Sequence, residues 1–221
     1  MESHNCQRRV IERACLRKKT EASPVRSLSQ KQEAQETKLF ERWSFKEVQV
    51  KDLGLQRYVS LKPIVVPHSM GRHEHKRFRK ANVNIVERLV NNIMHPGKNA
   101  GKKARAINIV KHALEIANLR TGKNPIEILV KAVENSAPCE DTTRISYGGV
   151  VYHLSVDIAP QRRVDLALRH ISEAAKQAAI NNPRSIEECL AEELVLAANN
   201  DVKSYAVAKR HEIERVAQSS R

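Results

Sequence analysis

No stretch of the sequence approaches the roughly 18 uninterrupted apolar residues that a membrane-spanning helix needs. The first residues also lack the apolar segment of a secretory signal. Their glutamates, from Glu2 to Glu36, are unusual in a mitochondrial transit peptide, so that interpretation is weak. We therefore expect no membrane-spanning segment and no secretory signal.

Aromatic residues and cysteines are also scarce. With only 4% aromatic residues, a core must be built from Leu, Ile, Val and Ala, which suits packed helices. The four cysteines lie far apart and form no C-x-x-C pair, which argues against a disulfide framework and against a zinc finger or ribbon. The chain is expected to be reduced and intracellular.

Acidic residues are outnumbered by basic ones, 25 to 39, which gives the 221-residue chain a formal charge of +14. Such a surplus costs self-repulsion in the free protein and is relieved by a polyanion. Nucleic acid is the first partner to consider, and an anionic membrane surface is the second.

Composition and pattern divide the chain into three parts. Residues 1–37 are polar and mixed in charge, which predicts a tail that is disordered or ordered only on RNA or partners. Residues 38–81 contain apolar side chains without a clean period, together with Pro63 and Pro67, and are expected to form a basic, extended arm that packs on a core. Residues 82–221 show helical periodicity and are expected to form the folded domain.

Six helices are predicted in this domain from local start and stop signals. The first opens at Asn84 and stops at His95-Pro96, and the second runs from about Ala100 to Gly122. The others run from Asn124-Pro125 to Pro138, from near Pro160 to before Pro183, from the capping box at Ser185, and from about Val202 to Gln218.

The segment at about 142–158 lacks the helical periodicity of the rest of this domain. Its residues are β-branched or aromatic and alternate with polar ones around Gly148-Gly149, which predicts a β-hairpin. The fold class is therefore mainly α: a bundle of about six helices with a protruding β-hairpin arm and an irregular N-terminal extension.

Basic residues gather in clusters that border the predicted domain. Each cluster alone is as readily a solvated face as a binding site, but three clusters around one core favour a phosphate-binding surface. They are Arg72, Lys76, Arg77, Arg79 and Lys80 before the first helix; Lys98, Lys102 and Lys103, followed by Lys111, at the second helix; and Arg162 and Arg163 at the fourth, with Arg144 on the hairpin.

No pattern indicates an enzyme, a cofactor or a metal site. The segment 97–103 is one residue short of a P-loop and has Lys103 where Ser or Thr should hold magnesium. His68, His73 and His75 are spaced as in a basic loop rather than as a ligand set. The glutamate pairs beginning at Glu187 suit a capped helix and a solvated face.

The chain from about Lys38 to Arg221 resembles the universal small-subunit ribosomal protein seven family in its eukaryotic cytoplasmic form, called ribosomal protein five in eukaryotes. The matching words include Pro67-His68-Ser69, Lys76-Arg77-Phe78-Arg79-Lys80-Ala81, Ile85-Val86-Glu87-Arg88-Leu89, Gly101-Lys102-Lys103, Glu140-Asp141-Thr142-Thr143-Arg144-Ile145, Arg162-Arg163-Val164 and Glu188-Cys189-Leu190-Ala191.

The resemblance implies a structural protein that binds the 3′ major (head) domain of small-subunit ribosomal RNA and helps to assemble the head. It implies neighbouring head and platform proteins, and messenger RNA and exit-site tRNA near the hairpin. It also implies no membrane partner, no homo-oligomer, and residence on cytoplasmic ribosomes, after nuclear or nucleolar assembly in a eukaryote. Family hairpins usually carry arginines near the tip, whereas this tip has Tyr147, Gly148, Gly149 and Tyr152.

Two other functions remain open from the residues alone. An architectural DNA-binding protein also combines a helical body with a two-stranded arm. An RNA-modifying enzyme would need a concave pocket with converging ionisable groups.

Overall fold

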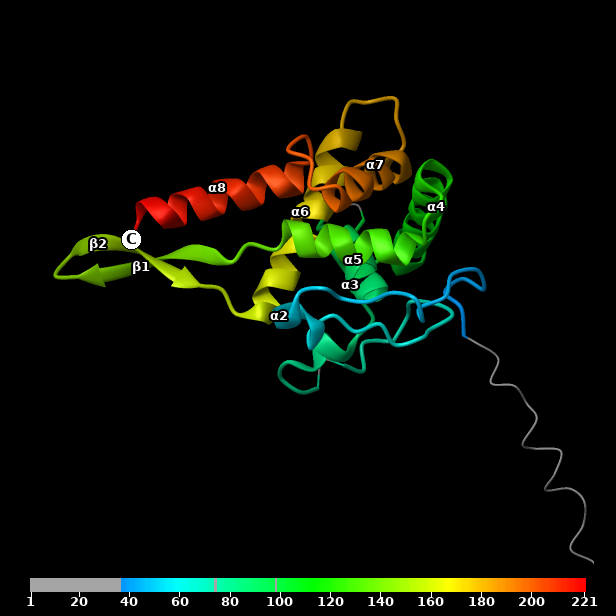
Figure 1. Ribbon diagram of the computed structural model, residues 1–221, viewed down its shortest axis with the longest axis horizontal. Helices are drawn as coiled ribbons and strands as arrows, with labels where there is room; N and C mark the ends of the chain where they lie inside the picture. Colours follow the sequence, from blue (N-terminus) through cyan, green and yellow to red (C-terminus); the bar gives the residue numbers. More distant parts are fainter. Residues whose placement is uncertain (1–36, 74, 98) are drawn as a thin grey trace, which may run out of the picture. The chain divides into compact units, whose positions relative to one another are not determined.

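The computed structural model describes residues 37–73, 75–97 and 99–221, which belong to one compact unit (Figure 1). The predicted tail, apart from Thr37, lies outside the described residues, as do Glu74 and Lys98. In the described part the chain is mainly helical and has one two-stranded antiparallel sheet, which confirms the predicted fold class. The elements are α2 (Leu53–Gln56), the 3₁₀ helix η2 (Arg79–Asn82), α3 (Ile85–Ile93), α4 (Lys103–Thr121), α5 (Pro125–Ser136), β1 (Glu140–Tyr147), β2 (Val150–Asp157), α6 (Pro160–Ala179), α7 (Ile186–Ala198) and α8 (Tyr205–Ser219).

Local capping groups fix most helix boundaries where the sequence predicts them. Asn84, Asn124 and Ser185 each accept a hydrogen bond from a backbone N–H two or three residues later, at 2.8, 3.1 and 3.3 Å. Gly122 ends α4 in the left-handed conformation, at φ 67°. Each cap satisfies a backbone group that the helix end would leave unpaired.

Two helices begin later than predicted. The chain turns at Gly101 (φ 72°) before α4 begins at Lys103 rather than near Ala100. Helix α8 begins at Tyr205 rather than near Val202, because Ser204 accepts a hydrogen bond from the Val207 N–H and forms the cap. The side chain of Val202, where the helix was predicted to begin, is exposed.

The core is aliphatic, as the shortage of aromatic residues predicts. Helix α7 packs against α4, α5 and α6. The largest fully buried side chains are leucines, isoleucines and a valine. Leu39 and Leu55 from the arm belong to the same buried cluster as the helices.

The arm is joined to the start of α3 by backbone pairing as well as by apolar contacts. The Ile85 N–H donates to the Ser60 carbonyl at 3.1 Å. The Asn84 side chain caps α3 with its oxygen and donates from its nitrogen to the Lys62 carbonyl at 2.7 Å. One buried asparagine therefore starts the helix and holds the arm against it.

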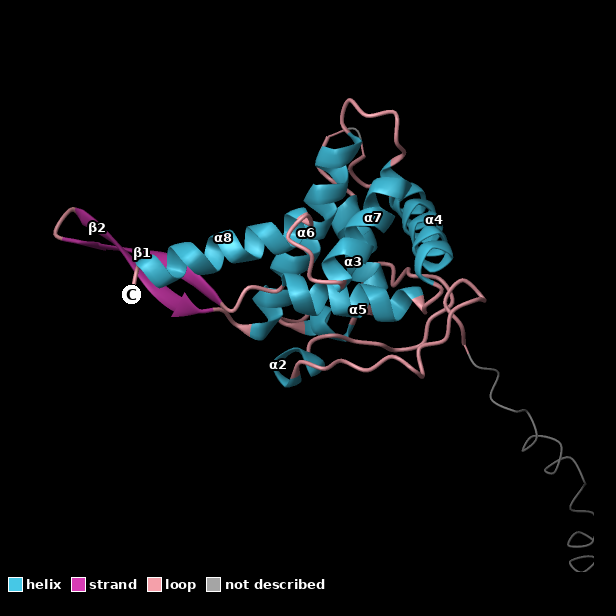
Figure 2. Ribbon diagram, turned by 45° about the horizontal axis from the view of Figure 1, so that its top comes forward, coloured by secondary structure: helices cyan, strands magenta, loops and turns pink. Residues whose placement is uncertain are grey.

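The hairpin leaves the bundle between α5 and α6 and runs beside α8 (Figures 1 and 2). Its strands begin at Glu140, two residues before the predicted start, and turn at Gly148-Gly149, where both φ angles are positive. Glu214 of α8 accepts a hydrogen bond from the Cys139 N–H at 3.1 Å, and Arg221 pairs with Glu140. These contacts support the base of a hairpin that would be marginal alone.

Candidate nucleic-acid interface

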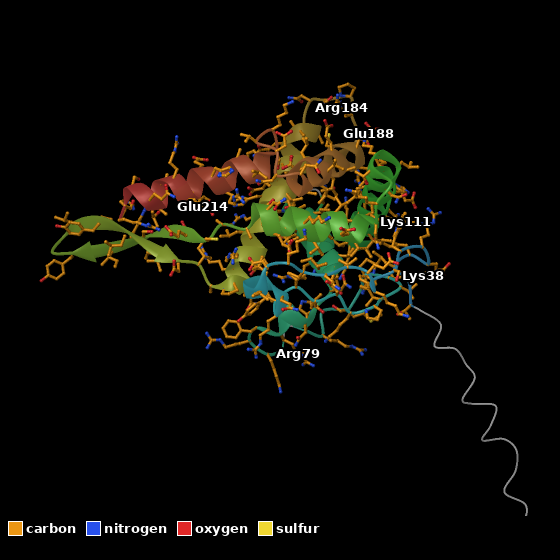
Figure 3. The ribbon with its side chains drawn as sticks, viewed as in Figure 1. Lys38, Arg79, Lys111, Arg184, Glu188 and Glu214 are labelled. Atoms are coloured by element: carbon orange, nitrogen blue, oxygen red, sulfur yellow. The ribbon has the colours of Figure 1, made fainter. Side chains whose placement is uncertain are left out.

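The arm segment before α3 carries exposed cations. Arg72, Lys76 and Arg79 have exposed side chains and no ion-pair partner within residues 37–73, 75–97 and 99–221. The Arg77 guanidinium lies 5.8 Å from the centre of the Phe78 ring. In Figure 3, Arg79 lies at the edge formed by the arm, whereas Arg184 and Glu188 lie at the opposite edge. The arm edge therefore offers cations to solvent.

Lys80 belongs to the same predicted cluster but is engaged within the protein. Its Nζ lies 2.5 Å from one oxygen of Asp165 in α6, and the Arg88 guanidinium lies 2.7 Å from the other. Arg88 also donates to the Tyr58 carbonyl at 3.0 Å, and its side chain is only 5% exposed. Asp165 thus ties together the arm, α3 and α6.

Lys103, at the start of α4, is likewise turned inward. Its Nζ lies 2.6 Å from Oε1 of Glu87, whose side chain is 4% exposed. The same oxygen accepts hydrogen bonds from the Ser69 N–H and hydroxyl at 2.8 and 2.7 Å. Burial raises the pKa of Glu87, but the bonds from Lys103 and Ser69 outweigh it, so the pKa lies below its ordinary value.

Arg162 and Arg163 are adjacent in sequence but differ in their surroundings. The Arg163 side chain is 14% exposed, lies 3.1 Å from Asp52 and donates to the Pro138 carbonyl at 3.2 Å. The Arg162 side chain is 65% exposed and lies 3.7 Å from Asp141. Arg162 can therefore reach a phosphate, as can the exposed Arg144 on β1, whereas Arg163 holds α2 and the hairpin base to α6.

The N-terminal end of α4 offers further positive charge. Lys102 is exposed and is the N-cap residue, but its side chain makes no capping hydrogen bond. Free N–H groups and the positive end of the helix dipole favour an anion at such a position. Arg105 is exposed on the first turn, and Lys111 is half-buried two turns further on. Lys98, the remaining predicted residue of this cluster, lies outside the described residues.

A cavity of about 260 Å³ opens between the arm and the start of α3. Glu87 and Asn84 lie among its lining residues, and both are held by the internal bonds described above. Its cations come from Lys62, Arg72 and Arg79, and its apolar wall from Ile64 and Val83. The cavity has the charge needed to hold a phosphate group.

The two faces of the hairpin differ in polarity. Cross-strand partners share a face, so Tyr147 with Val150 and Ile145 with Tyr152 form one apolar face. These four side chains are between 46% and 81% exposed. The opposite face carries Glu140, which bonds to Ser155 and pairs with Arg221 at the end of α8.

The structure also bears on metal binding and on membrane insertion. Within the described ranges, no group of three His, Cys, Asp or Glu residues is placed to hold a metal ion. His68 accepts a hydrogen bond from the Met70 N–H, and His73 lies 3.2 Å from the Ser69 hydroxyl. None of the helices searched in that same part of the chain has the length and apolar character needed to cross a bilayer.

Sequence reasoning missed two kinds of residue at this interface. Lys62 lines the cavity, but it stands apart from the basic clusters. Asp165 is one acid in an amphipathic helix, and only the fold brings it to Lys80 and Arg88. The excess of basic residues over acidic ones around 72–80 was the available signal, and Arg72, Lys76, Arg77 and Arg79 in that segment are exposed.

A helical domain with exposed cations on an arm and at a helix N-terminus, and with a projecting hairpin, has the features of a basic nucleic-acid-binding protein. Comparison with known proteins then identifies the family. The family model described as Ribosomal protein S7p/S5e matches residues 55–221, and this chain belongs to that family.

Curated relatives cover nearly the same length. A protein named small ribosomal subunit protein uS7 from Methanosphaera stadtmanae is 56% identical over 183 residues, which are 83% of this chain and 98% of the relative. Proteins of the same name from Cenarchaeum symbiosum and Methanothermobacter thermautotrophicus are each 54% identical, over 86% and 82% of this chain and 99% and 98% of their own lengths. The resemblance to the family is thus confirmed, and the assignment to its eukaryotic form stays a prediction.

Proposed function

We propose that this chain is a structural constituent of the small ribosomal subunit that binds the subunit's RNA. The family match over residues 55–221 carries this proposal. The relatives that share more than half of their residues with the chain are named as small-subunit proteins. This family favours a structural role over an RNA-modifying enzyme and places the protein on ribosomes in the cytoplasm.

The physical mechanism is neutralisation of phosphates where RNA helices converge. Exposed cations displace counterions from the RNA, which favours binding and makes it depend on salt. The aliphatic core fixes the positions of those cations, so the protein selects RNA that presents phosphates in a matching arrangement. Most contacts are then to backbone and shape rather than to base sequence.

The predicted RNA-binding residues divide into two groups by their environment. Arg72, Lys76, Arg77, Arg79, Lys102, Lys111, Arg144 and Arg162 present charge to RNA, and Arg105 joins them. Lys80, Lys103 and Arg163 act by positioning the arm, the α4 start and the hairpin base, because each lies within 3.1 Å of a carboxylate. Arg162 differs from them because its side chain is 65% exposed and lies 3.7 Å from Asp141. Only loss of a residue in the first group removes a phosphate contact.

The finer assignments follow from the family resemblance. The RNA is the 3′ major domain that forms the subunit head, and the neighbours are head and platform proteins. The hairpin tip, at Tyr147, Gly148, Gly149 and Tyr152, reaches toward the exit site, the tRNA there and the messenger RNA. The exposed apolar face of the hairpin supports contact by stacking and packing rather than by arginines. In a eukaryote, assembly takes place in the nucleus and nucleolus.

The test is binding of the full chain to a head-domain ribosomal RNA fragment across a range of salt concentrations. Lys102→Gln should reduce the magnitude of the log–log salt slope by about 1, because one phosphate contact is lost. Lys103→Gln should leave that slope within error of wild type. It should instead destabilise the fold by about 3–5 kcal/mol in chemical denaturation, because it leaves the buried Glu87 carboxylate without its cationic partner.

The two lysines are a matched pair, adjacent in sequence and equal in charge. If Lys102→Gln leaves the slope unchanged, the α4 start is not at the interface. If Lys103→Gln lowers the slope as much as Lys102→Gln does, the division into contacting and positioning residues is wrong. Competition with duplex DNA distinguishes the proposed function from the architectural DNA-binding alternative. Only the DNA-binding alternative predicts that duplex DNA displaces the RNA.

A further inference from the structure

Phe78 is held in a backbone conformation that does not suit its side chain. Its φ is 60° and its ψ is 2°, in the left-handed region, where the Cβ atom crowds the backbone. Asn and Asp adopt this region more readily than other side chains, and for a bulky residue it is a clear outlier. The conformation belongs to a turn in which the Arg79 N–H donates to the Lys76 carbonyl at 3.3 Å and Phe78 is the third residue, the position that has a positive φ in a type II turn.

Packing does not explain why phenylalanine occupies this position. The residue is 70% exposed and is absent from the buried core and from the side chains packed against it. Little apolar surface is therefore removed from water to offset the backbone strain. Strain that the fold tolerates without a packing gain is typical of binding sites.

The surroundings of Phe78 are cationic. Lys76, Arg77 and Arg79 are exposed around it, and Arg77 lies over the ring with its guanidinium 5.8 Å from the centre. Arg79 also lines the cavity between the arm and α3. A protein partner covering the ring would have to desolvate these cations, whereas RNA supplies both a flat base and phosphates to neutralise them.

We propose that Phe78 is a stacking platform for one unpaired base of the bound RNA. The base lies on the ring, and the flanking phosphates bind Arg77 and Arg79. Sequence-tolerant stacking on aromatic rings is how proteins hold unpaired bases, and guanidinium groups stack in the same way. This inference depends on the proposed function, since it names the part of the RNA that the arm binds, an unpaired base.

The experiment uses the full chain and the head-domain RNA fragment. Phe78→Asn removes the ring and keeps the left-handed turn, because asparagine tolerates that conformation. It should weaken RNA binding by roughly 5- to 100-fold, the range for loss of one base stack, and leave the salt slope unchanged because no charge is lost. Phe78→Leu should lose affinity in the same way, and Phe78→Trp should keep it. Leu119→Asn, at an 84% exposed position on α4, is the matched control and should bind as wild type.

The melting temperature of the free protein is a second readout. A ring that only stabilised the fold would lower Tm when removed, whereas the proposed stacking role predicts a rise. In the free protein, Phe78→Asn should raise Tm by about 2–4 °C, because strain is relieved and little packing is lost. A fall in Tm would show that the ring stabilises the fold and would overturn the proposal. For a spectroscopic check, Phe78→Trp is combined with Trp43→Phe, and the emission of the introduced tryptophan should be quenched when the RNA fragment binds.

The outcomes separate this inference from the proposed function. If wild type binds the RNA and both Phe78→Asn and Phe78→Leu bind equally well, the stacking site does not exist although the RNA-binding function stands. If the variants bind RNA normally but enter small-subunit particles poorly, the ring meets a protein and the inference is wrong. If wild type itself ignores the RNA, the proposed function fails as well.

Discussion

Ionisable side chains in this protein are placed in very different environments, even on the same helix. On α6, Asp165 is held by two cations, whereas His170 is 7% exposed and neither ring nitrogen has a hydrogen-bond partner in the described part of the chain. Burial is the main cause that lowers the pKa of His170, and the nearby Lys209 and Arg169 lower it further, against the opposing effect of Glu173. The neutral form of His170 is therefore favoured in the folded protein.

This placement predicts a pH effect on stability. The pKa of His170 is lower in the folded state than the value of about 6.5 expected in the unfolded state, so on acidification the unfolded state takes up the proton first. The free energy of unfolding should fall as pH drops below about 6.5, by at most about 1.4 kcal/mol per pH unit from this group. Denaturant unfolding at a series of pH values from 8 to 5 measures this decrease in the free energy of unfolding.

His170→Leu is the matching variant, because it keeps an apolar body at the site and cannot titrate. It should be at least as stable as wild type at pH 8 and should lose less stability between pH 6.5 and pH 5. Parallel pH profiles for the two proteins would show that other groups cause the acid sensitivity.

At the scale of elements, the middle of α7 and the start of α8 are linked by hydrogen bonds. Glu193 of α7 is 8% exposed and accepts hydrogen bonds from the Ser204 hydroxyl at 2.7 Å and the Ala206 N–H at 3.0 Å. Ser204 is also the cap of α8. One hydroxyl thus satisfies a buried carboxylate and begins the helix that supports the hairpin.

Ser204→Ala should therefore cost more than an ordinary cap. The loss of a capping hydroxyl is typically worth about 1 kcal/mol, and a buried group left short of a partner adds about 1–3 kcal/mol. We expect a loss of about 2–4 kcal/mol in denaturant unfolding. Ser185→Ala, at an exposed cap without a buried carboxylate, should cost only about 1 kcal/mol. Equal losses would remove the special role of Glu193.

Local signals in the sequence predicted the elements well, because caps act over two or three residues. Asn84, Asn124 and Ser185 start helices through bonds to their own next turn. The short helix α2, capped by Asp52, was missed because four residues give no period to detect. The predicted start of the last helix was three residues too early, since the cap is Ser204 and Val202 lies before it.

The candidate site was predictable only as a charge surplus. Which cations face solvent depends on partners distant in sequence: Lys103 meets Glu87 across 16 positions, and Arg163 meets Asp52 across 111. Nothing in the sequence separates Lys102 from Lys103 or Arg162 from Arg163. The fold alone divides these neighbours into exposed and paired side chains.

At the scale of the whole molecule, the charge of +14 makes the free protein repel itself. Raising NaCl from 0.05 to 0.5 M should therefore raise Tm by a few degrees, about 2–4 °C for each 1 kcal/mol gained. Buried pairs such as Lys103–Glu87 should weaken little, because salt screens them less than exposed charges.

The combined variant Arg72→Gln, Lys76→Gln and Arg79→Gln should show a smaller rise in Tm, since it carries three fewer exposed positive charges. A fall in Tm with salt in wild type would mean that attractive ion pairs outweigh the repulsion.

The hairpin that turns its apolar side outward has a consequence for handling the protein. In the absence of RNA, electrostatic repulsion between positively charged copies keeps the exposed apolar strands of different molecules apart. A short polyanion that neutralises the charge but does not cover the strands removes this electrostatic repulsion. A complex that is neutral in charge but still exposes the hairpin should aggregate more readily than either component alone. An RNA long enough to include the binding partner of the hairpin should reverse this aggregation.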